Sequence, residues 1–108
     1  MSEFDEFRAV IQKRANTNDE WDYGVHLCWN EMVSVFSEDM AKTIRFLETE
    51  CTASEYSWLS EVFEDIAEKT QSKDFIAALR RLAAKYPEET ERYNVMSFID
   101  GAESCIWS

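Results

Sequence analysis

Hydrophobic positions along the chain recur at the three- and four-residue spacing of amphipathic helices. This spacing predicts six helices, at about residues 3–14, 19–36, 37–47, 52–69, 72–83 and 87–106. No segment shows the strict alternation of apolar and polar residues that marks a half-buried strand. The short connections favour antiparallel neighbours. The sequence therefore predicts one all-α domain over residues 1–108, packed as antiparallel helical hairpins.

Several predicted helices carry start signals of their own. Thr52 followed three residues later by Glu55 forms a capping box, and Ser37 and Ser72 are good N-cap residues. Pro87 suits a first helical turn, where its missing N–H has no intrahelical partner. These signals place four of the predicted helix starts.

The apolar stripes of the predicted helices indicate which residues form the core. The stripe of the second helix contains Trp21, Val25, Cys28, Trp29, Met32, Val33 and Phe36. The stripe of the sixth helix contains Tyr93, Met96, Ile99, Ala102 and Ile106.

Charge changes this picture from a generic helical domain to one with a preferred kind of partner. The 108 residues include 22 acids against 11 Lys and Arg, a formal net charge of −11. Such a surface repels the phosphates of nucleic acids and attracts basic proteins. We therefore expect a basic protein partner and no direct nucleic-acid binding.

One acidic group is predicted along the fourth helix. At about 100° per residue, Glu61, Glu64, Asp65 and Glu68 share an arc of about 100° opposite the core, with Trp58 at its shoulder. A partly exposed Trp among carboxylates is typical of an interface that faces a basic partner. The alternative is a solvated helix face with Trp58 folded into the core.

A second acidic group surrounds two aromatic residues at the start of the second helix. Asp19, Glu20 and Asp22 flank Trp21 and Tyr23 at a loop-to-helix junction, where binding residues are often displayed. Acids at this position also suit the positive end of the helix dipole. Both interpretations remain open at this point.

No recognisable catalytic, metal-binding or cofactor-binding motif is present, so we expect neither enzymatic activity nor a cofactor. The single histidine, His26, is interpreted as a half-buried helix residue. Cys28, Cys51 and Cys105 contain no C-x-x-C pair and are interpreted as reduced thiols. The N-terminal residues lack the features of a signal peptide, and no apolar run is long enough to span a membrane. We therefore expect a cytoplasmic protein without membrane contact.

The C-terminal half resembles the small immunity proteins of bacterial contact-dependent growth inhibition, a class of toxin–immunity system. The segments that carry the resemblance are WLSEVFEDI (58–66) and EKTQSKDFI (68–76), followed by Leu79, Leu82, KYP (85–87) and Tyr93-Asn94. The resemblance implies a protein that binds the toxin domain of its cognate effector and blocks it. Many such toxins are basic nucleases, including ones that cleave tRNA.

The net negative charge and the resemblance together predict that this chain covers a basic toxin domain in a one-to-one complex, with carboxylates placed where phosphates would bind. The predicted contacts are Trp58 and the acids of the two groups above. The alternative is an acidic helical adaptor, or a nucleic-acid mimic, that binds another basic protein. The sequence leaves open whether the chain also pairs with itself.

Overall fold

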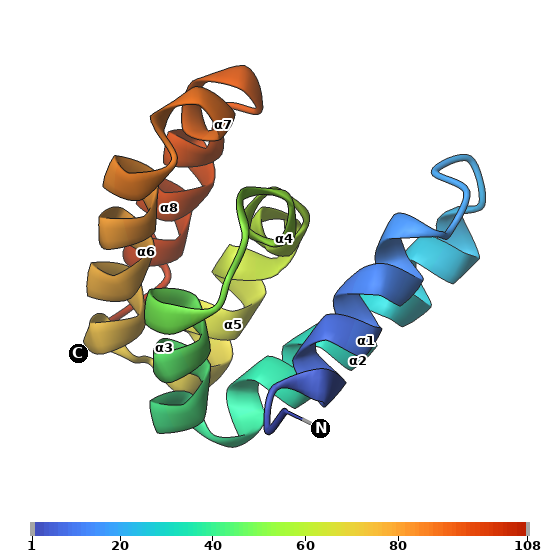
Figure 1. Ribbon diagram of the computed structural model, residues 1–108, viewed down its shortest axis with the longest axis horizontal. Helices are drawn as coiled ribbons and strands as arrows, with labels where there is room; N and C mark the ends of the chain where they lie inside the picture. The colour runs from blue at the N-terminus through green and yellow to red at the C-terminus, as the bar shows by residue number, and fades with distance from the viewer. Residues whose placement is uncertain (1, 108) are drawn as a thin grey trace.

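A computed structural model describes residues 2–107 (Figure 1). Within this range the chain is helical and contains no strand, which confirms the all-α prediction. The elements in order are α1 (Asp5–Ala15), α2 (Asp22–Glu38), α3 (Met40–Thr49), α4 (Ala53–Leu59), the 3-10 helix η1 (Ser60–Val62), α5 (Phe63–Thr70), α6 (Lys73–Lys85), α7 (Pro87–Arg92) and α8 (Val95–Ser104).

Three of the predicted helix starts are confirmed by their hydrogen bonds. The Thr52 hydroxyl accepts from the Glu55 N–H at 3.2 Å, and the Glu55 carboxylate accepts from the Thr52 N–H at 2.9 Å, which completes the capping box. The Ser72 hydroxyl accepts from the Phe75 N–H at 3.1 Å at the start of α6. Pro87 is the first residue of α7.

The predicted start of a helix at Ser37 is wrong. Helix α2 continues to Glu38, and α3 begins one residue after Asp39. The reason is that Asp39, which adopts an extended conformation, caps α3 through a 3.2 Å bond from the Lys42 N–H to its carboxylate.

Two predicted helices are interrupted. The segment 52–69 tightens into η1 between α4 and α5, so that α4 packs on α1 and α7 while α5 packs on α2 and α8. The segment 87–106 breaks at Asn94, whose φ of 53° is left-handed and ends helical geometry. In both places the interruption lets adjacent segments reach different neighbours.

The aromatic core begins inside the α1–α2 hairpin. The rings of Phe7 and Phe36 stack with centroids 4.3 Å apart, and Phe46 of α3 meets Phe7 edge-on at 5.2 Å. Beyond this hairpin, the main packing pairs are α5 with α8, α3 with α6 and α6 with α8, which are distant in sequence. The radius of gyration of 12.9 Å matches the value of about 13 Å expected for one compact domain of this size.

Three aromatic or sulfur-containing residues of the predicted apolar stripes are exposed instead. Trp21 is 57% exposed, Tyr93 is 49% exposed and Met96 is 40% exposed. Tyr23, which lies beside Trp21 and was not part of a predicted stripe, is 67% exposed. Trp21 precedes the first residue of α2, and Tyr93 lies at the break before Asn94. Neither side chain therefore follows the helical period on which the prediction rested.

Candidate protein-binding face

The loop between α1 and α2, with the first turn of α2, presents the acidic and aromatic group predicted around Trp21. We call residues 17–23 the hairpin tip. It projects beyond the end of α1, well away from α6 and α8 (Figure 1). Asp19, Glu20 and Asp22 are exposed, as are Trp21 and Tyr23, whose ring centroids are 6.3 Å apart. The five residues thus form one exposed acidic and aromatic surface.

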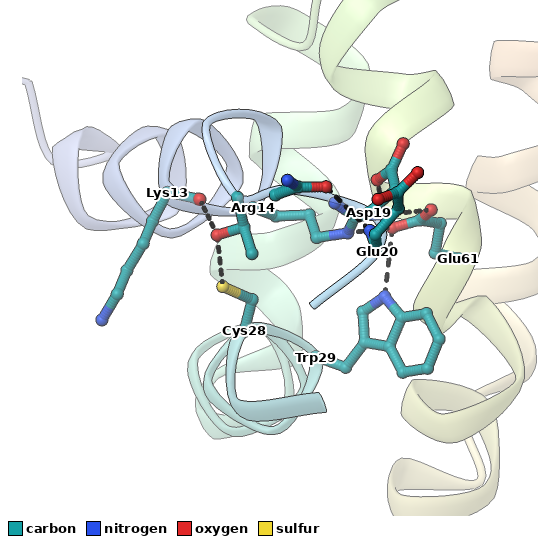
Figure 2. Close-up of polar contacts among 9 residues, drawn as sticks. Lys13, Arg14, Asp19, Glu20, Cys28, Trp29 and Glu61 are labelled. Carbon is teal, nitrogen blue, oxygen red and sulfur yellow. Dashed lines mark hydrogen bonds and ion pairs between the residues drawn. The ribbon is translucent and has the colours of Figure 1, made fainter. Parts of the chain in front are cut away.

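Local hydrogen bonds hold the base of the hairpin tip (Figure 2). The Thr17 hydroxyl donates to the Lys13 carbonyl at 2.7 Å and lies 3.3 Å from the Cys28 sulfur of α2. The Asn18 side chain accepts from the Glu20 N–H at 2.8 Å. The tip is therefore an ordered turn tied to both helices of the hairpin.

A buried arginine connects the hairpin tip to the segment that follows α4. The Arg14 side chain is only 5% exposed and donates to Glu61 through Nε at 2.7 Å and through Nη2 at 3.0 Å. Nη2 also donates to Asp19 at 2.9 Å, and the Trp29 indole N–H donates to Glu61 at 3.0 Å (Figure 2). The Trp58 ring covers the guanidinium at 4.9 Å. This Arg14 network joins the two acidic groups, which lie far apart in the sequence.

The two carboxylates stabilise the charged guanidinium of Arg14. Burial alone would lower the pKa of Arg14, but the hydrogen bonds and charges of Glu61 and Asp19 outweigh it and raise the pKa above its ordinary value. The sequence interpretation did not select this residue. The sequence pattern that could have identified Arg14 as buried is its spacing from Phe7 and Ile11, which puts the arginine on the buried face of α1.

Trp58 is half-buried and separates two surface hollows. A hollow of about 590 Å³ lies between α4 and the α7–α8 corner, lined by Tyr93 and Phe98 among others. A second, of about 560 Å³, lies between α1 and α4 and includes Arg8 and Ile11. Trp58 lines both, so it forms a ridge next to the Arg14 network. Its position is intermediate between the two predicted alternatives, exposed contact and core residue.

The helix that was predicted to carry four carboxylates on one face is not continuous, because η1 interrupts it at Glu61. Glu61 lies in η1 and turns toward Arg14 and Trp29. Glu64, by contrast, lies against α8, where a Cβ at Gly101 would come within 2.8 Å of the Glu64 carboxyl carbon. Glu61 is therefore a structural residue of the Arg14 network.

The other three acids of that group stay exposed on α5. Partial burial and the charges of Glu64, Glu68 and Asp65 raise the pKa of Cys105, the residue that follows α8. Whether Glu64, Asp65 and Glu68 contact a partner remains a prediction.

The residues considered for chemistry occupy unremarkable places. His26 is exposed rather than half-buried, with its ring edge-on to Trp29 at 5.0 Å. Cys28 and Cys51 are buried, Cys105 is half-buried, and all three are free thiols. Burial raises the pKa of Cys51 to about 12. Within residues 2–107, no three potential ligands gather in a way that could hold a metal ion. No helix in that range has the length and apolarity needed to cross a bilayer.

No family model, curated protein or solved structure matches this chain. The resemblance to immunity proteins therefore stays a prediction.

Proposed function

We propose that this chain is an immunity protein that binds a basic bacterial toxin domain in the cytoplasm and blocks its active or substrate-binding site. One observation carries the proposal. In a chain of net charge −11, the hairpin tip exposes Trp21 and Tyr23 between three carboxylates. Exposed aromatic residues flanked by acids are complementary to a toxin surface that binds nucleic acid through lysines and arginines.

The two components of this surface act on different steps of binding. The net negative charge attracts a basic partner over a distance of about one Debye length, roughly 8–10 Å near physiological salt, and raises the association rate. The aromatic rings lose water only when contact is complete, so they act mainly on dissociation. The inhibition is stoichiometric occlusion, and no residue of this chain carries out a chemical step on the toxin's substrate.

Growth rescue tests the proposal directly. The toxin domain encoded immediately upstream of this gene would be expressed in cells with and without this protein. We expect rescue only when both are present, together with a one-to-one complex on sizing. An association rate that falls about tenfold or more between 50 and 200 mM salt would identify electrostatic attraction as its cause. A toxin domain that still kills and forms no complex would contradict the proposal and favour the adaptor alternative.

A further inference from the structure

We infer that the hairpin tip is the part of the chain that enters a concave, lysine- and arginine-lined cleft of the partner, of the kind that holds a phosphate backbone. This inference rests on the proposed function and assigns it to one surface. The alternatives within the molecule are the Trp58 ridge and the carboxylates of α5.

Charge favours the tip over the Trp58 ridge. At the ridge, Glu61 is neutralised by Arg14, and in the larger hollow the charge of Arg92 is offset by that of Glu89. At the tip, Asp19 also pairs with Arg14, but Glu20 and Asp22 form no ion pair within the described residues. The tip therefore presents carboxylates that a basic cleft can still neutralise.

Shape favours the same surface. The tip stands at the free end of a two-helix hairpin (Figure 1), so it can enter a concave surface that the broad faces of the domain cannot reach. Leu27, which is 47% exposed one helical turn beyond Tyr23, extends the apolar part of the tip along α2.

The main aromatic contact is already in place before binding. The Trp21 ring lies on the α2 backbone at Gly24, where an added Cβ would sit 2.1 Å from the ring carbon Cε3. Glycine is disfavoured inside a helix, yet only glycine leaves room for this ring. The Trp21 ring is held in place by packing on Gly24 although the residue is 57% exposed, so binding does not carry the entropic cost of ordering this side chain.

Two glycine substitutions separate the tip from the rest of the chain. Gly24→Ala removes the space under Trp21, whereas Gly101→Ala meets only the carboxylate end of the flexible Glu64 side chain. Both replace a helical glycine by a better helix former. With the upstream toxin domain as the probe, we expect G24A to speed dissociation by about tenfold or more and G101A to change it by less than about twofold. In the free protein, only G24A should shift the Trp21 indole resonance.

A second variant covers the case in which G24A leaves the ring able to bind. The double variant W21A/Y23A removes both exposed rings, and we expect dissociation at least as fast as with G24A.

A labelled single-stranded oligonucleotide supplies the readout for the cleft, and we expect the wild-type chain to displace it from the toxin domain.

Each contrary outcome points to a different error. If the wild type binds and both tip variants bind as tightly, the tip is not the contact. If only G101A weakens binding, the contact lies on α5. If the complex still binds the oligonucleotide, the tip lies outside the cleft. If the Trp21 indole resonance shifts with the concentration of the free chain, the tip contacts a second copy of this chain. If the wild type forms no complex, the proposed function itself fails.

Discussion

At the scale of single residues, Arg14 decides how the candidate face is assembled. Its guanidinium contacts Glu61 and Asp19 at hydrogen-bond distance and supports the Trp58 ring. Removing one partner of a buried ion pair leaves the other charge uncompensated, which costs more than the pair itself contributes. Glu61 is therefore expected to matter for the stability of the fold.

Two arginines with the same number of carboxylate partners test this argument. Arg14→Met should lower the free energy of unfolding by about 2–4 kcal/mol, because Glu61 is left partly buried without its counter-charge. Arg80 bonds Asp100 and Glu103, but its side chain is 39% exposed. Arg80→Met should therefore cost less than about 1 kcal/mol. Urea unfolding of both variants measures the difference, and equal losses would show that burial of the Arg14 network contributes nothing.

At the scale of elements, helix ends follow local signals while helix continuity does not. The capping box at Thr52 starts α4 as the sequence predicts, but packing ends α4 after seven residues. Such a short helix depends strongly on its cap, because it has few hydrogen bonds of its own.

Replacing the cap should destabilise the whole domain through α4. Thr52→Ala removes the hydroxyl that accepts from the Glu55 N–H, and we expect a loss of about 1 kcal/mol in the free energy of unfolding. Thr49→Ala is the matched control, since the Thr49 hydroxyl bonds only the Arg45 carbonyl within α3. Its effect should stay within about 0.5 kcal/mol. Chemical denaturation distinguishes the two, and a neutral T52A would mean that tertiary contacts alone hold α4.

At the scale of the whole molecule, residues 51–56, which lead into α4, contact distant parts of the chain. The Cys51 carbonyl accepts from the Tyr86 hydroxyl at 2.7 Å, and the Tyr56 hydroxyl lies 2.7 Å from that of Thr90. Burial raises the pKa of Cys51 to about 12 and also raises that of Tyr56. Folding thus favours the protonated form of both groups.

Stability should therefore fall in alkali. Because the folded pKa of Cys51 is about 12 against an ordinary 9.0, its contribution is complete below pH 9.0 and is lost as the pH rises toward 12. The loss is on the order of a few kcal/mol. Unfolding free energies measured from pH 8 to pH 11 should show the decline. Cys51→Ala should make it shallower, and a slope unchanged by this substitution would contradict the assignment to Cys51.

The sequence by itself determined the features that depend on neighbouring residues. Helical class, the caps at Thr52 and Ser72, the start at Pro87 and the acidic group around Trp21 all arise within a few positions of chain, where spacing and side-chain chemistry suffice. The tertiary structure alone decided three other features of the molecule. Arg14 meets Glu61 across 47 positions, which no local pattern encodes. The segment 52–69 is interrupted by η1, its two halves pack on different helices, and at the interruption Glu61 turns toward Arg14. Trp21 is exposed because it precedes α2 and rests on Gly24, so a ring that the helical period assigned to the core lies on the surface of the hairpin tip.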